Sequence, residues 1–384
     1  MKSPICEMLG IEFPLIAFSH CRDVVAAVSK AGGFGVFGAS RQSLGSSPQT
    51  PESVEEELRW IDDHVGGKPY GIDLIIPENL STRGEADVSY RSLQTRIPEA
   101  HRDYSKKLLA GYGVELDYPQ AEAEMPQPYD HDTAMAILRV SLKHPIKLIA
   151  NALGVPPPEM IALGREHGVA VAALIGSKEH ALRQVAAGVD ILVAQGTEAG
   201  GHCGEVSTLV LVPEVLQALE GVSDTPVLAA GGIMTGRQMA ACMAMGAAGV
   251  WTGSVWLSTT DAETLPAVRE KLLAASSRDT VRSRSRSGKP ARQLRSAWTD
   301  AWDQSPDSPG VLPMPLQSMV STPAYRAIDR AVEGGNDAAR DLVSYVVGQG
   351  VGLLDSEISA AATVQEFKLD FLTAVERMGE LLEE

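Results

Sequence analysis

The sequence predicts an α/β fold of the (β/α)8 TIM barrel class, with an insertion after the third strand and a helical C-terminal extension. Eight short apolar runs separated by amphipathic stretches indicate eight strand–helix units. Most runs lack polar alternation, which is typical of parallel strands buried on both faces. Such a barrel needs about 250 residues, and the chain has 384, so there is room for additions. An open doubly wound sheet stays an alternative, because one sequence does not fix strand order.

Each predicted strand is an apolar run of five to eight residues, most of them flanked by glycine, proline or charged residues. The spacing is short and regular from the fifth strand to the eighth, so the alternation of strand and helix is clearest there. The predicted strands cover residues 14–18, 33–39, 70–76, 146–153, 169–175, 190–196, 226–232 and 249–254.

Capping residues indicate where helices begin and end. Ser177 is a favourable N-cap, and Gly188 suits the left-handed conformation that ends many helices. The predicted helices cover residues 132–144, 156–168, 177–188 and 235–246, and another begins near Asp23.

Two regions depart from the repeat. Residues 77–131 are polar and rich in turn residues, and they follow the third strand at the end where such barrels keep their active sites. A lid or substrate-selecting subdomain and a surface elaboration or oligomer contact are both open for this insertion. Residues 259–384 are expected to form helices and loops, part of them closing the barrel. The predicted barrel core is then residues 1–76 with 132–258.

The net charge of the chain indicates which kinds of partner it can bind. The formal net charge is −16, and a surface this acidic repels nucleic-acid phosphates. Residues 278–295 are the exception, with seven bases and one acid. Their alternation of serine and arginine predicts a solvated loop, with a phosphate-facing loop as the alternative. Nucleic-acid binding is not expected, because no aromatic residues lie between the arginines to stack on bases.

Several other classes are excluded by composition. The four cysteines form no CxxC pair, and no His, Asp and Glu residues cluster with metal-ligand spacing, so neither a disulfide framework nor a metal site is expected. No run of eighteen apolar residues occurs, and the first residues do not read as a signal peptide. We expect a cytoplasmic protein without a membrane span. A homo-oligomer is compatible with the sequence.

The strongest local motif is QGTEAGGHCG, residues 195–204, directly after the sixth strand. Gly200 and Gly201 lack a Cβ, so the backbone can approach a flat ligand closely. His202 follows them, and histidine can take or give a proton near neutral pH. The motif predicts a ligand site with His202 as its acid or base.

Glycines and small hydroxyl residues also follow the seventh and eighth strands, in AAGGIMTG and GVWTGS. This is where the fold class keeps its phosphate site. Backbone N–H groups of Gly231, Gly232, Gly253 and Ser254 can bind a phosphate without a lysine. Together the two motifs predict a phosphate-bearing cofactor or substrate.

With these motifs the chain resembles the nitronate monooxygenase family of FMN enzymes, formerly called 2-nitropropane dioxygenases. The resemblance is carried by QGTEAGGHCG and AAGGI at this spacing, by PLIAF and AGGFG near the start, and by YGIDL on the third strand. It implies a TIM barrel with FMN at the carboxyl ends of the strands, and a small-molecule substrate with O2.

The resemblance also implies roles for particular residues. His202 would be the catalytic base. Contacts to the flavin would come from Gln195 and Gly200, and contacts to its phosphate from Gly232, Gly253 and Ser254. The backbone around Ala17, Phe18 and Ser19 would lie under the isoalloxazine ring.

Two departures from the family pattern lie in the site. Ala17-Phe18-Ser19-His20 stands where the family has Gln-Ala-Pro-Met, so His20 is either a residue at the start of a helix or a second imidazole facing the substrate. Asp73 stands where the family has an asparagine that contacts the flavin. An aspartate can still accept a hydrogen bond from the ring, but its charge would disfavour an anionic reduced flavin.

The expected reaction is the FMN-dependent oxidation of alkyl nitronates by molecular oxygen. His202 would deprotonate a neutral nitroalkane, or in its positive form orient a nitronate. The alternative is an FMN-dependent NAD(P)H oxidoreductase such as an enoyl-thioester reductase, with the basic residues 278–295 facing a coenzyme phosphate. A non-catalytic phosphate-binding barrel is the third possibility.

Overall fold

Eight parallel strands form a closed barrel in a computed structural model that describes residues 1–39, 50–76, 90–118 and 131–382. The predicted (β/α)8 fold is confirmed and the open sheet is excluded, because the first strand pairs with both the second and the last. In order around the barrel the strands are β1 (Leu15–Ser19), β2 (Phe34–Gly38), β3 (Tyr70–Ile75), β4 (Leu148–Ala152), β5 (Ala170–Ile175), β6 (Ile191–Gln195), β8 (Val227–Ala230) and β9 (Gly249–Thr252).

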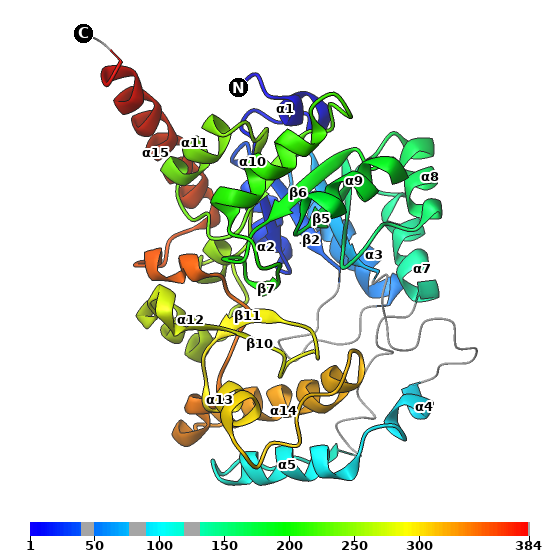
Figure 1. The fold of residues 1–384 in the computed structure, drawn as a ribbon, viewed down its shortest axis with the longest axis vertical. Helices are drawn as coiled ribbons and strands as arrows, with labels where there is room; N and C mark the ends of the chain where they lie inside the picture. Colours follow the sequence, from blue (N-terminus) through cyan, green and yellow to red (C-terminus); the bar gives the residue numbers. More distant parts are fainter. Residues whose placement is uncertain (40–49, 77–89, 119–130, 383–384) are drawn as a thin grey trace.

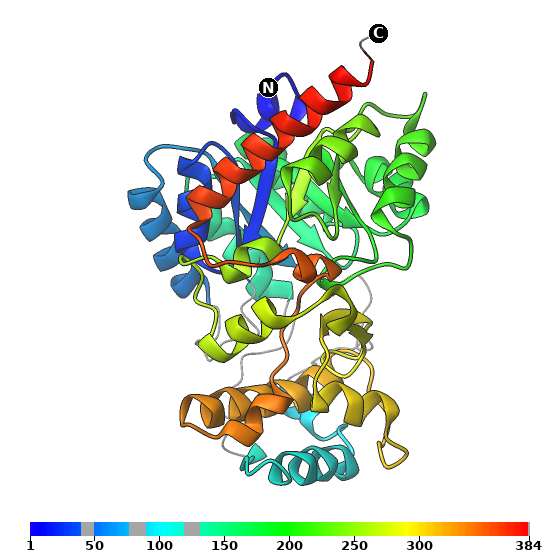
Figure 2. The same cartoon turned by 90° about the vertical axis from the view of Figure 1, so that its left-hand side faces the viewer.

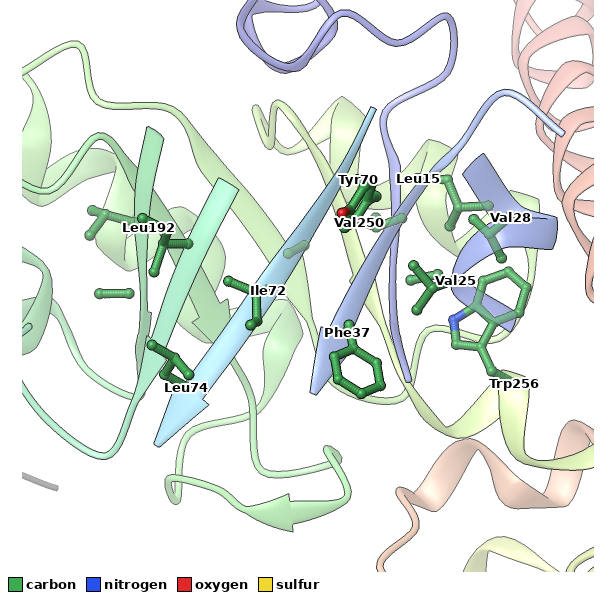
Figure 3. Close-up of a cluster of buried hydrophobic side chains, with 14 of the residues drawn as sticks. Leu15, Val25, Val28, Phe37, Tyr70, Ile72, Leu74, Leu192, Val250 and Trp256 are labelled. Atoms are coloured by element: carbon green, nitrogen blue, oxygen red, sulfur yellow. The ribbon is translucent and has the colours of Figure 1, made fainter. Parts of the chain in front are cut away.

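The alternation of side chains along each strand separates two apolar layers. One layer fills the barrel, with residues such as Ile16 and Val36, and helix α1 (Pro4–Leu9) joins it. The other lies between the barrel and its helices. Figure 3 shows Leu15 of β1 beside Val25 and Val28 of α2 in that outer layer.

Helices surround the barrel, and the predicted caps are present. The Ser177 side chain accepts from the N–H of His180, and Gly188 has φ +90°. The helices of this ring are α2 (Arg22–Lys30), α3 (Pro51–His64), α7 (His131–Ser141), α8 (Pro158–His167), α9 (Lys178–Ala187), α10 (Thr208–Leu219), α11 (Gly236–Ala244) and α15 (Ala360–Glu380). The C-terminal helix α15 packs on α11 and α2, and its far end projects beyond the barrel (Figure 1). None of the helices in the described residues is long and apolar enough to cross a membrane.

A second apolar core lies beyond the carboxyl ends of the strands, and helices from both additions build it (Figure 2). Trp298 and Ile328 from the tail pack there with Leu109 from the insertion. The helices of this region are α4 (Tyr90–Gln94), α5 (Glu99–Ala110), α12 (Pro266–Ala274), α13 (Ala297–Gln304) and α14 (Leu316–Glu333), with short 3-10 helices η1 (Ser254–Ser258), η2 (Ser277–Asp279), η3 (Asp337–Leu342) and η4 (Gln349–Leu353). Much of the insertion, residues 77–89 and 119–130, lies outside the described residues.

The prediction of a solvated Ser/Arg loop is wrong. Strands β10 (Thr280–Ser283) and β11 (Ala291–Leu294) form an antiparallel hairpin, and β11 also pairs with β7 (Gly201–His202). Ser283, Ser285 and Ser287 are at most 3% exposed. The serine hydroxyls are buried with hydrogen-bond partners, as in the bond from Ser283 Oγ to Ser285 Oγ. The serines of this alternation are therefore buried at the end of β10 and in the turn that follows it.

Candidate active site

A cavity of about 570 Å³ lies at the carboxyl ends of the barrel strands, the end where this fold class keeps its active sites. Segments far apart in the sequence line it: the strand ends, the glycine loops and the β10–β11 hairpin. All but one of the site residues predicted from the sequence line this single cavity, namely Phe18, Ser19, His20, Asp73, Gln195, Gly200, Gly201, His202, Gly231, Gly232, Gly253 and Ser254.

Ala17 is the exception, because it does not line the cavity. Its side chain is fully buried in the layer between the barrel and the helices. Neighbouring residues of a strand point to opposite faces, so Phe18 faces the barrel interior instead. The Phe18 ring stacks against Trp251 with 6.4 Å between ring centroids. These two rings give the cavity an apolar surface.

Three backbone donors meet at the ends of β8 and β9. The N–H groups of Gly232, Gly253 and Ser254 donate no hydrogen bond to any described residue. A Cβ on Gly253 would meet nothing closer than Phe18 Cδ1 at 3.9 Å, so the space beside it is open. Gly232 has φ +71°, a conformation that favours glycine. Unpartnered N–H groups of this kind suit an anionic oxygen cluster such as a phosphate.

Glu198 joins the two glycine loops, a contact that the sequence reasoning missed. Its Oε2 accepts from the N–H of Thr208 at 3.0 Å, and Thr208 Oγ1 lies 3.0 Å from the same oxygen and 3.1 Å from the carbonyl oxygen of Ala230. The acidic residue of the QGTEAGGHCG motif therefore holds the loop after β6 against the start of α10 and the end of β8. Its place inside the motif was the signal that could have indicated this role.

The β10–β11 hairpin holds His202 at the cavity. His202 pairs with Ala291 across β7 and β11, and its Nε2 lies 2.7 Å from Ser287 Oγ. Burial, with smaller effects from the charges of Lys289 and Arg286, lowers the pKa of His202 to about 4. The imidazole is therefore neutral at pH 7. The expectation that its positive form orients an anion is not supported at that pH.

Two cations from the hairpin lie beside His202, and the sequence reasoning did not place them individually. The Arg286 guanidinium lies 3.9 Å from the centroid of the Tyr325 ring and donates to Gln293 Oε1 and the Ser344 carbonyl. Lys289 is half-buried, and its ammonium has no hydrogen bond or ion pair among the described residues. Burial lowers the pKa of Lys289. An unpaired cation in a partly buried wall favours an anionic ligand.

The two residues that depart from the family pattern both reach the cavity. His20 precedes α2, and its Nδ1 donates to the Gly38 carbonyl at 2.9 Å. Its ring lies edge-on to Phe18, with centroids 5.1 Å apart. Asp73 on β3 is 4% exposed, and burial raises the pKa of its carboxyl well above the ordinary value. In the described part of the chain, no three His, Cys, Asp or Glu side chains gather as metal ligands would.

Comparison with known proteins identifies the family. The family model described as nitronate monooxygenase matches residues 2–370. The chain belongs to the nitronate monooxygenase family. It is thus an oxidoreductase, and the residues that line its cavity are the candidate active site of a nitronate monooxygenase-family enzyme.

Individual relatives agree with this membership. A protein of Mycobacterium tuberculosis (strain ATCC 25618 / H37Rv) named as a monooxygenase is 50% identical over 386 residues and covers 100% of both chains. The solved nitroalkane oxidase of Streptomyces ansochromogenes is 25% identical with a TM-score of 0.77, over 97% of this chain and 99% of that one. FabK of Thermotoga maritima, also solved, is 25% identical with a TM-score of 0.69 over 100% of both chains.

Proposed function

We propose that this chain binds FMN and oxidises alkyl nitronates with molecular oxygen. One observation carries the proposal. A single cavity combines three unpartnered backbone donors, an apolar surface of two rings, and a neutral imidazole beside two cations. These are the surroundings that a phosphorylated flat cofactor and a small anionic substrate need.

The residues present fit FMN. Gly232, Gly253 and Ser254 would hold its phosphate through their N–H groups, and Phe18 would lie against the ring system. Gly201 has φ +75°, and no atom lies within 4 Å of where a Cβ would stand, so the backbone leaves room for a ring. When bound, FMN supplies the electron-accepting chemistry, and the protein supplies orientation and electrostatics.

The charges of the site favour a nitronate over a neutral nitroalkane. A base with a pKa of about 4, as His202 has, gives little driving force for removing a proton from carbon. A nitronate has already lost that proton and is an anion. Lys289 and Arg286 would then attract it, and Lys289 has no other partner among the described residues. The preferred substrate is therefore the preformed nitronate, with His202 acting as the base for nitroalkanes.

The test measures oxygen consumption by the FMN-loaded enzyme with a nitroalkane and with its nitronate, for wild type and for His202→Asn. We expect the substitution to lower nitroalkane turnover about 100-fold, because a positioned base contributes roughly 10²–10⁴. Nitronate turnover should change only a few-fold. Unchanged nitroalkane turnover in His202→Asn would rule out the role of base.

A second candidate is an FMN-dependent NAD(P)H oxidoreductase such as an enoyl-thioester reductase. The observation that favours it is the pair of cations, Arg286 and Lys289, which suit a coenzyme phosphate as well as a nitronate. The similarity to FabK over the whole chain is compatible with it. Mixing the FMN-loaded enzyme with NADPH without oxygen separates the two: rapid loss of flavin absorbance supports the reductase, and a stable spectrum supports the monooxygenase.

A further inference from the structure

Asp73 is an acidic side chain in the interior of the barrel. Along β3 the side chains of Tyr70, Ile72 and Leu74 pack in the outer layer (Figure 3). Because neighbouring residues of a strand face opposite sides, the Asp73 side chain points into the barrel. It lies at the carboxyl end of the strand, lines the cavity and is 4% exposed. Its neighbours in the barrel lining include Phe18 and other apolar side chains. A carboxyl group in this position has lost most of its contact with bulk water.

No described residue compensates for that loss. The Asp73 carboxyl has no hydrogen bond or ion pair among the described residues. Burial raises the pKa of this carboxyl well above its ordinary value, which favours the neutral acid over the carboxylate. None of the other ionisable side chains that line the cavity contributes to this shift: His20, Cys21, His180, Arg183, His202, Cys203, Arg286, Lys289 and Tyr345.

The protonation state decides what Asp73 can bind. A carboxylate only accepts hydrogen bonds, whereas a neutral carboxylic acid donates one and accepts one side by side. This pair is complementary to a C(=O)–N–H edge, such as the imide edge of the flavin pyrimidine ring. A buried polar group without a partner is costly, so a ligand with such an edge is stabilised here.

We propose that Asp73 binds the pyrimidine edge of FMN as a neutral carboxylic acid, donating one hydrogen bond and accepting another. The proposal rests on FMN being the cofactor. It removes the conflict expected from the sequence, because a neutral acid does not repel an anionic reduced flavin. It also makes FMN binding depend on a proton: affinity is full below the pKa of Asp73 and falls as the pH rises through it.

The first experiment measures FMN binding to the apo-protein by flavin fluorescence, for wild type, Asp73→Asn and Asp73→Leu. The amide of asparagine also offers a donor and an acceptor, so Asp73→Asn should bind FMN within about three-fold of wild type. Leucine offers neither, and we expect Asp73→Leu to bind about tenfold more weakly or worse. Wild-type affinity should fall about tenfold per pH unit above the pKa of Asp73, and Asp73→Asn should be flat.

The second experiment observes the proton directly. An infrared spectrum of the wild-type apo-protein at pH 7 should contain the C=O band of a protonated carboxyl group, which Asp73→Asn removes and FMN shifts. Asp329 is the matched control, because burial also raises its pKa, to about 6, and it does not line the cavity. Asp329→Asn should leave the FMN-sensitive band in place.

The outcomes separate this inference from the proposed function. Wild type that binds no FMN overturns the proposed cofactor and the inference with it. FMN binding without the carboxyl band, or with a band that FMN does not shift, overturns the inference alone. Equal affinity of wild type and Asp73→Leu does the same. Where Asp73→Leu does not fold, the pH profiles decide, and identical profiles for wild type and Asp73→Asn overturn the inference.

Discussion

His202 and Lys289 lie side by side at the cavity but differ in charge. The hairpin places a cation beside a half-buried imidazole, and both the loss of solvent and that charge lower the pKa of the imidazole. The ring is then available as a proton acceptor while the lysine carries the positive charge. In the proposed function, positive charge and proton acceptance therefore belong to different side chains.

The pH dependence of nitroalkane turnover tests this division. Because the pKa of His202 is lowered to about 4, the neutral base is present above that pH and lost below it. At pH 5.5 a histidine of ordinary pKa would be only about 10% neutral, whereas His202 should be almost fully neutral. We expect kcat/KM to stay level from pH 8 to pH 5.5. An acid limb near 6.5 would contradict the assignment.

Removing the cation should weaken nitronate binding. Hydrogen bonds to charged groups contribute about 1.5–3 kcal/mol, so Lys289→Met should raise the KM for nitronates about tenfold or more. It should also move the acid limb of His202 to higher pH, since one nearby positive charge is gone. Arg278→Met is the control, because this exposed arginine makes the same change of charge outside the cavity. Equal effects of the two substitutions would indicate only long-range charge.

The side chains of Ala17 and Phe18 point to opposite faces of β1, which the sequence alone did not indicate. The resemblance indicated the end of β1, where Phe18 and Ser19 line the cavity, but it did not give the side of the strand to which each side chain points. Lys289 could not be assigned a place beside His202, because its position depends on β11 pairing with β7, about 90 residues earlier in the chain.

Among the elements, the barrel strands were predictable and the hairpin was not. Strands buried on both faces consist of apolar runs, which are visible in the sequence. The hairpin strands are four residues long and mostly polar, and their partner β7 has two residues. Helix α13 lies between the basic segment and the proline-rich passage, and it was not predicted. These elements are stabilised by contacts distant in sequence, which local patterns do not contain.

Helix α15 docks closely on the barrel at one glycine. A Cβ at Gly236 would lie 2.1 Å from the Phe367 carbonyl oxygen and 2.4 Å from the Phe371 nitrogen. Gly236→Ala should therefore displace α15 and lower the free energy of unfolding by about 1–3 kcal/mol or more, measured by urea denaturation. Gly379 lies in α15 itself, and a Cβ there would meet no atom within 4 Å, so Gly379→Ala should be neutral or slightly stabilising. Equal stability of both variants would contradict the close docking.

In the whole molecule, two apolar cores meet at the cavity. The barrel core provides the strand ends, and the second core supports the hairpin that pairs with β7 (Figure 1). Both additions to the barrel, which the sequence only marked as irregular, contribute to the second core. The site therefore depends on packing that lies outside the barrel.

A pair of core substitutions tests that dependence. Trp298 is fully buried in the second core, and Trp298→Ala should lower the free energy of unfolding by about 3–5 kcal/mol. It should also lower turnover per folded molecule, because β11 loses support. Leu9→Ala, in the helix that joins the barrel interior, should cost about 2–5 kcal/mol and leave turnover unchanged. Stability is measured by thermal denaturation, and kcat is measured well below the melting temperatures of all variants. Unchanged turnover in Trp298→Ala would contradict the prediction.

The glycine loops also form hydrogen bonds with residues 348–349, late in the chain. The N–H of Gln349 donates to the Glu198 carbonyl at 2.8 Å, and the N–H of Gly348 donates to Ser254 Oγ at 2.9 Å. On the ribosome the eight strands emerge well before this segment does. A nascent chain that has already made all eight strands therefore still lacks the segment that holds the glycine loops, so the cavity is completed only at a late stage of synthesis.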